Sequence, residues 1–190
     1  MKVVVSRLSG LFITIFLVVA NAILIEVIFD LYGIPKHRLW TGIAGTLIII
    51  LSFTYSMRKR KKLITQGSPK YWLQGHEWLS IAGTFIIFVH TGTHFKALVP
   101  VITLIFMSIA FVSGLVGRYV YNNVKSSLKE KQTEMKKAGL AEEEIEQRLW
   151  SLTVASEALS KWRDVHMPII AFLGVMVLYH SISALYYAGF

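Results

Sequence analysis

Residues 72–95 of the chain read WLQGHEWLSIAGTFIIFVHTGTHF, and this stretch decides the class of fold. It is mostly apolar, and a helix needs about 20 such residues to cross the hydrocarbon layer of a bilayer. Similar apolar stretches occur at four other places, namely 9–32, 38–57, 98–120 and 164–188. Of the 190 residues 54% are apolar and only 16% are charged, whereas a soluble domain carries about 25% charged residues. We therefore expect an all-α membrane protein, a five-helix transmembrane bundle that forms a single domain over residues 1–190.

The first apolar stretch has some features of a secretory signal. Lys2 and Arg7 give it a basic start, and Ala20-Asn21-Ala22 resembles a cleavage site. The apolar run nevertheless continues to Phe29, which is longer than the core of a signal peptide. We expect this segment to be kept as the first membrane span.

The formal net charge of +9 is explained by topology. In a five-span arrangement almost all basic residues fall on one side, and only Lys36, Arg38 and Lys96 fall on the other. Cytoplasmic flanks of membrane helices are enriched in Lys and Arg. The pattern predicts an integral, multi-pass protein of the inner (cytoplasmic) membrane of a prokaryote, with the N-terminus in the cytoplasm and the C-terminus outside. The basic run 58–62 is expected to bind anionic lipid, and no nucleic acid partner is expected.

Residues 121–162 differ in character from the apolar stretches. They are rich in Lys and Glu, and their sparse apolar residues recur at steps of three, four and seven, the narrow stripe of one helix that pairs with another. Gly139 interrupts this pattern and suits a left-handed helix cap. We expect a cytoplasmic helical hairpin between the fourth and fifth spans, with a helix restart near Asp164 because Pro168 lacks a backbone N–H. The alternative is a solvated, partly disordered loop.

Four of the six histidines form two pairs with the same interval. His76 and His90 are 14 residues apart, and so are His166 and His180. Fourteen residues at about 100° each end roughly 40° short of four full turns, and they rise about 21 Å, so both members of a pair share a helix face near opposite edges of the membrane. Cysteine is absent, which excludes thiolate-ligated clusters and Cys-attached c-type haem within this chain.

Topology then pairs the histidines by depth. The spans at 72–95 and 164–188 both start on the inner side, so His76 and His166 share the inner depth, and His90 and His180 the outer depth. Two facing imidazoles can supply both axial ligands of a haem iron. The alternatives are buried hydrogen-bond partners and a site for a transition metal, but a compact metal site requires ligands only a few residues apart.

Several further residues are candidates for the haem sites. Gly83 and Gly174 lie near the midpoints of the two histidine intervals, where bare backbone makes room for a macrocycle. His94 follows His90 by one turn, but as a ligand it would stretch the interval to about 27 Å, which favours His90; His94 is then a candidate for propionate binding or proton transfer. The expected cationic partners of the haem propionates are Arg118, Lys161 and Arg163 inside, and Lys96 and Arg38 outside.

Glu26 stands inside an apolar run, where a carboxyl group is costly unless it is used or paired. One hypothesis makes Glu26, together with His94, part of an outer quinone or proton site. The other is a structural ion pair with Lys96 or Arg38. Glu77, next to His76, is a weaker inner candidate for a proton acceptor.

The segment from Gly75-His76-Glu77 through His90, together with His166-Met167-Pro168 through Tyr179-His180, resembles the dihaem membrane cytochromes b. The arrangement is similar to the transmembrane core of ferric reductases and NADPH oxidases, and to quinone-linked b subunits of respiratory complexes. The resemblance implies two haem b groups and electron transfer across the membrane. The reductases and oxidases continue into a flavin and nicotinamide domain, whereas this sequence ends at Phe190 and contains no Gly-rich dinucleotide motif, so we expect it to move electrons for a partner.

The expected function is therefore that of a membrane subunit in a respiratory redox complex, either without catalysis of its own or reactive toward quinone. The expected partners are the quinone pool and an iron–sulfur, flavin or multihaem subunit. Two other hypotheses remain open at this point. One is a stand-alone transmembrane reductase of metal ions or oxygen, and the other is a haem-free membrane anchor or channel.

Overall fold

The computed structural model describes residues 2–34, 37–55, 67–92, 95 and 97–187. All regular secondary structure in these residues is helical, so the predicted all-α class is confirmed. The elements are α1 (Lys2–Leu31), α2 (His37–Ser52), α4 (Pro69–Thr91), α5 (Leu98–Val116), the π-helix η1 (Gly117–Tyr121), α6 (Asn122–Lys137), α7 (Glu142–Ser160) and α8 (Trp162–Tyr187).

Within the described ranges, three helical segments are long and apolar enough to cross a membrane: Ser9–Leu31, Leu98–Lys137 and Asp164–Tyr187. Large apolar side chains such as Phe12, Phe16 and Val175 are exposed on them, as on a surface that faces lipid. The apolar part of α2, Arg38–Ser52, is shorter than a span. Helix α4 has 23 residues but also holds polar side chains, including His76, Glu77 and His90, which lower its hydropathy.

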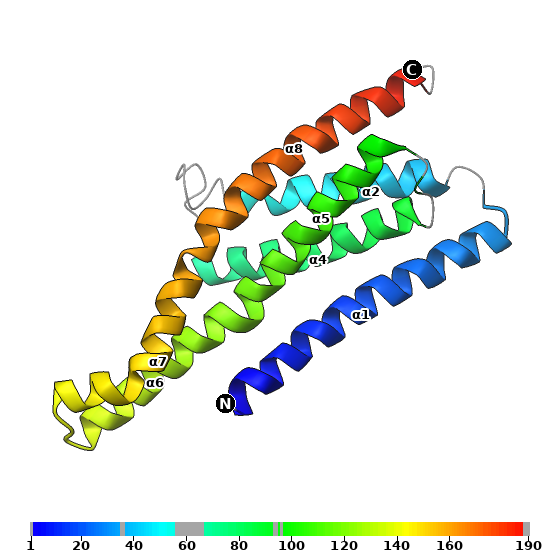
Figure 1. Ribbon diagram of the computed structural model, residues 1–190. Helices are drawn as coiled ribbons and strands as arrows, with labels where there is room; N and C mark the ends of the chain where they lie inside the picture. The colour runs from blue at the N-terminus through cyan, green and yellow to red at the C-terminus, as the bar shows by residue number, and fades with distance from the viewer. Residues whose placement is uncertain (1, 35–36, 56–66, 93–94, 96, 188–190) are drawn as a thin grey trace.

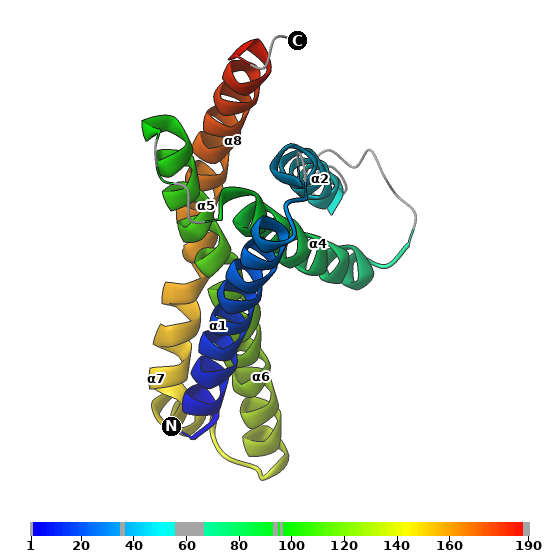
Figure 2. The same ribbon diagram turned by 90° about the vertical axis from the view of Figure 1, so that its right-hand side faces the viewer.

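The helices alternate in direction (Figure 1). α1, α4 and α8 run one way, and α2 and α5 run the other way. The N-terminus and the α6–α7 hairpin therefore lie toward one end of the molecule, and the C-terminus lies at the opposite end (Figures 1 and 2). This arrangement gives α4 and α8, which carry the two histidine pairs, the same general direction.

Two clusters of apolar side chains hold the helices together. The first joins α1, α4 and α5 around Leu11, Phe111 and Leu115, and the second joins α2, α4, α5 and α8 around Met107 and Leu173. Helices α4 and α5 contribute to both clusters, so they form the centre on which the other spans pack.

Helices α2 and α4 approach each other through glycines. A Cβ on Gly45 would lie 2.8 Å from the Ile87 Cδ1 atom, and a Cβ on Gly83 would lie 2.6 Å from Cγ1 of Ile49. Real side chains do not reach such distances, so only glycine allows the two backbones to come this close. Small residues serve the same purpose wherever membrane helices pack tightly.

The helical hairpin predicted for residues 121–162 is present. Val124 on α6 and Ile145 and Leu149 on α7 are buried between the arms, as the apolar stripe predicted. Gly139 adopts φ +78° in the turn, a left-handed conformation that costs glycine little. Lys136 and Glu142 form an ion pair of 2.8 Å across the same turn.

The chain between the hairpin and α8 follows the predicted break. α7 ends at Ser160 and α8 begins at Trp162, so the helix restarts slightly before the expected position. Asp164, near which the restart was expected, lies in the first turn of α8. The π-turn at Gly117–Tyr121, where α5 continues into α6, has no counterpart in the sequence-based prediction.

Candidate functional site

His90 on α4 and His180 on α8 face each other. Their ring centroids are 6.2 Å apart, and the ring planes are inclined by 58°. These two residues are far apart in sequence and were paired above only by their expected depth. The fold thus brings the outer pair of histidines together.

The hydrogen bond of the His90 ring fixes which nitrogen carries its proton. Nδ1 of His90 lies 2.6 Å from the carbonyl oxygen of Arg38. A carbonyl oxygen can only accept, so Nδ1–H is the donor, and Nε2 of the neutral ring keeps its lone pair. Histidines that bind metals commonly donate their other ring N–H to a carbonyl group, which orients the ring.

His76, near the other end of α4, has the same arrangement. Its Nδ1 lies 2.9 Å from the carbonyl oxygen of Ser52, the last residue of α2, so Nε2 again keeps the lone pair. Tyr55 stacks against the His76 ring with centroids 5.6 Å apart. Helix α2 therefore orients both histidines of α4 through backbone carbonyl groups at its two ends.

His166 on α8 is oriented from α5. Its Nδ1 makes a short hydrogen bond with the hydroxyl group of buried Ser113, and Trp162 Nε1 donates to the Ser113 carbonyl at 3.0 Å. Each inner histidine is thus oriented by a helix other than its own, His76 by α2 and His166 by α5.

The outer pair has a spacing that suits two axial ligands. Bonds between a metal ion and an imidazole nitrogen are about 2.0–2.1 Å long in zinc sites, so two imidazoles on opposite sides of one ion have ring centroids roughly 6 Å apart. The observed 6.2 Å agrees with this value. The described residues hold no group of three or more His, Cys, Asp or Glu that could bind a metal ion. A haem iron takes only two axial histidines from the protein, so such a site does not need a group of three ligands.

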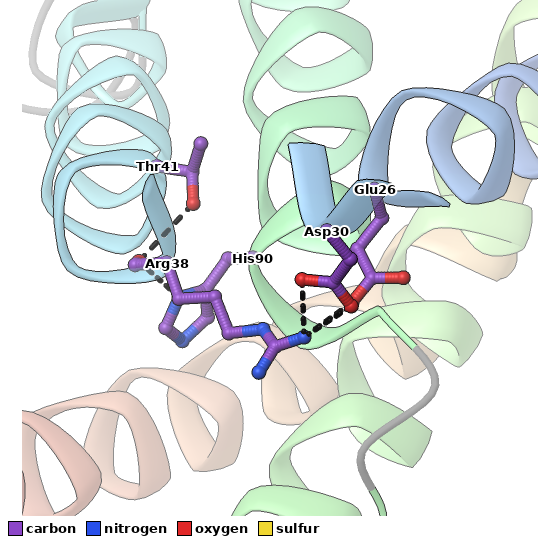
Figure 3. A network of polar contacts seen from close by, with 5 residues as sticks. All are labelled: Glu26, Asp30, Arg38, Thr41 and His90. Carbon is purple, nitrogen blue, oxygen red and sulfur yellow. Dashed lines mark hydrogen bonds and ion pairs between the residues drawn. The ribbon is translucent and has the colours of Figure 1, made fainter. Parts of the chain in front are cut away.

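An arginine lies close to each end of α4. Nη2 of Arg38 contacts Glu26 Oε1 at 2.6 Å and the Asp30 carboxylate at 3.0 Å (Figure 3). The expected ion pair of Glu26 with Arg38 is therefore present. Nε of the same guanidinium is buried and has no hydrogen-bond partner among the described residues.

Arg118, in the π-turn, occupies the corresponding inner position. Its Nη1 lies 3.2 Å from Glu77 Oε2, and its guanidinium lies over the Trp78 ring at 4.7 Å from the centroid. The distance between Nη1 and Glu77 is that of an ion pair, but the two groups are not aligned for a hydrogen bond. This buried Nη1 therefore also has no hydrogen-bond partner in the described part of the chain.

The remaining predicted residues have different outcomes. Gly83 packs against Ile49 on α2, which gives a reason for glycine that is independent of any cofactor. Gly174 is exposed, with open space where a Cβ would be. His94, Lys96 and the side chain of Arg163 lie outside the described residues.

Three contacts of this site could not be read from sequence. The carbonyl groups of Ser52 and Arg38 leave no trace in a residue pattern, and Ser113 is one of many serines in apolar helices. Among the residues around His90, Gly42 comes closest to a sequence signal for the site, because a Cβ there would lie 2.8 Å from the His90 ring.

No protein-family model, curated protein or solved structure matches this chain.

Proposed function

We propose that this protein is a membrane cytochrome b that carries electrons across the bilayer through two haem b groups. His90 and His180 would bind the outer haem, and His76 and His166 the inner one. The observation that carries the proposal is the outer pair of imidazoles, 6.2 Å apart, with Nδ1 of His90 bonded to the Arg38 carbonyl, so that Nε2 is the nitrogen that can bind a metal ion. A haem iron bound by two such nitrogens can take up and release one electron.

The hydrogen bonds of the histidines support the same proposal. His76 and His90 both donate Nδ1–H to carbonyl groups of α2. Residues that serve only packing have no need for one shared tautomer at two positions 14 residues apart. Ligands of an iron do need it, because both must present Nε2 with a lone pair.

The two arginines support the placement of the haem propionates. A buried N–H group without an acceptor costs free energy, about 1–3 kcal/mol. Arg38 and Arg118 each have one such group. The carbonyl of Arg38 bonds His90, and Arg118 pairs with Glu77, the residue that follows His76. A propionate carboxylate would satisfy the Nε of Arg38 at the outer site and the Nη1 of Arg118 at the inner site.

The proposal includes a five-helix transmembrane bundle in the inner membrane of a prokaryote. It adds α2 and α4 to the three segments that meet the length and hydropathy of a span. The alternating directions of the helices support it, since each reversal brings the chain back across the layer (Figure 1). The excess of Lys and Arg near the N-terminus and in the hairpin favours the cytoplasmic side for that end.

The physiological role that fits best is a subunit of a respiratory redox complex. Electrons would be exchanged with quinone or quinol, or with an iron–sulfur, flavin or multihaem partner subunit. The α6–α7 hairpin is rich in Lys and Glu and offers a polar surface for such a partner.

A reduced-minus-oxidised visible spectrum of the purified protein tests the proposal. We expect the α band of a low-spin haem b. His90→Ala and His180→Ala should each remove the same haem and leave the other, because the two residues share one iron. Two haems retained in either variant would contradict the ligand pairing, and the absence of any haem band in the native protein would favour an anchor or channel.

A further inference from the structure

We propose that Glu26 is a positioning residue for His90, which acts through Arg38. The inference rests on the proposed function for its consequence at the haem, but its geometry involves only residues of this chain. Glu26 and Asp30 come from α1, Arg38 from the first turn of α2, and His90 from the end of α4 (Figure 3). One arginine therefore links three helices.

Arg38 contacts His90 through its backbone and Glu26 through its side chain. Its carbonyl oxygen accepts the Nδ1–H of His90 at 2.6 Å and the hydroxyl of Thr41 at 3.1 Å. Its guanidinium binds Glu26 at 2.6 Å. The ion pair with Glu26 limits the conformations that Arg38 can adopt next to His90. The carboxylate of Glu26 thereby restrains the carbonyl that sets the His90 tautomer.

Glu26 is the stronger of the two anchors. Its side chain is 1% exposed, whereas that of Asp30 is 46% exposed and contacts the same Nη2 atom at 3.0 Å. An exposed ion pair contributes little because water screens it. A buried carboxylate must keep its cation close, since removing either partner leaves an uncompensated charge in a medium of low dielectric constant.

The end of α4 is shaped around Glu26. Gly92, two residues after His90, caps this helix with φ +51°, and a Cβ on Gly92 would collide with the Glu26 carboxylate. The glycine therefore serves both the backbone conformation and the space that the carboxylate fills. Glu26 therefore contacts the end of α4 directly at Gly92, as well as through Arg38. The contact at Gly92 sets the position of α1 along α4 next to His90.

The experiment compares Glu26→Gln with Asp30→Asn in the full-length protein in nanodiscs. ¹⁵N spectra of labelled histidine rings report the tautomer without haem. The native protein should show the Nδ1–H form of His90 alone. Glu26→Gln should add an Nε2–H form, and Asp30→Asn should change the His90 signals much less. The His76 signals should stay native in both variants, because Ser52 orients that ring at the far end of α4.

The same variants are then loaded with haem. We expect the affinity of the outer site to fall about 10- to 100-fold in Glu26→Gln, the usual effect of losing a residue that orients a metal ligand, and that of the inner site to stay unchanged. If Glu26→Gln disturbs the His76 signals and so the fold, Arg38→Lys replaces it. The shorter lysine side chain keeps a cation near Glu26 but cannot place it where Nη2 of Arg38 lies, so the contact with Glu26 weakens and the Nε2–H form of His90 should appear again.

The outcomes separate this inference from the proposed function. A native His90 tautomer and native outer-site affinity in Glu26→Gln, or in Arg38→Lys where that variant is needed, would overturn the positioning role while leaving the haem proposal intact. A shifted tautomer in a protein that binds no haem would support the positioning role and refute the proposed function. Equal effects of Glu26→Gln and Asp30→Asn would also overturn the inference, because burial would then not matter.

Discussion

Replacing Gly42 by Ala should disturb the outer site and leave the inner one intact. A Cβ at this position would lie 2.8 Å from both Cε1 and Nδ1 of His90, whereas ordinary contacts begin at 3.4 Å. The ring must therefore shift by about 0.6 Å, the difference between those two distances. It is held at 2.6 Å from the Arg38 carbonyl oxygen, so the shift also strains that hydrogen bond.

The cost of this shift can be put in terms of affinity. Overpacking of one methyl group typically costs about 1–3 kcal/mol. If the native ring position is recovered only when the iron is bound, this strain weakens the outer site by about 5- to 150-fold. Haem titration of the purified apoprotein, followed at the Soret band, measures both sites in one experiment.

Gly75→Ala is the matched control for this prediction. It lies on α4 near His76, and a Cβ there meets nothing within 4 Å. Alanine should even favour the helix by about 1 kcal/mol. Native affinity at both sites in Gly42→Ala would refute the reasoning, and so would an equal loss at the inner site.

Three further changes test the fold and the inner site. Gly83→Ala should separate α2 from α4 and lower the thermal stability of both haem sites, since its Cβ would meet backbone atoms of α2 at 3.2 and 3.3 Å that cannot rotate away; native stability in a thermal melt would argue against this packing. Ile145→Ala should destabilise the hairpin by about 2–5 kcal/mol and speed its proteolysis without loss of haem, because Ile145 is 1% exposed between α6 and α7; unchanged cleavage rates would show that the arms do not pair. Ser113→Ala should shift the potential of the inner haem alone, because Ser113 bonds His166; a redox titration in which the outer haem moves instead would contradict the assignment.

The periodic features of the fold could be predicted from sequence. The helical class follows from the apolar stretches, and the hairpin follows from the spacing of residues such as Ile145 and Leu149. The juxtaposition of His90 and His180 followed from an equal interval combined with the direction of the spans. These inferences succeed because helical periodicity converts a count of residues into a position in space.

The contacts that orient the histidines could not be predicted. They come from two backbone carbonyl groups and from the hydroxyl of Ser113, and none of these is indicated by a residue type at a fixed spacing. Gly83 was predicted to make room for a cofactor, whereas its nearest contact is Ile49 on α2. A glycine leaves room for a neighbouring helix as well as for a macrocycle, so its spacing in the sequence does not show which of the two it contacts. The sequence left two roles open for Glu26, and the structure shows that its carboxylate pairs with Arg38.

The haem content of the purified full-length chain tests the central claim most directly. A pyridine haemochrome assay, combined with a protein determination by amino-acid analysis, gives the number of haem b groups per chain. We expect two haem groups per native chain, and one in each variant that lacks a single axial histidine. A native protein that binds no haem, when expressed with an ample haem supply, would contradict it.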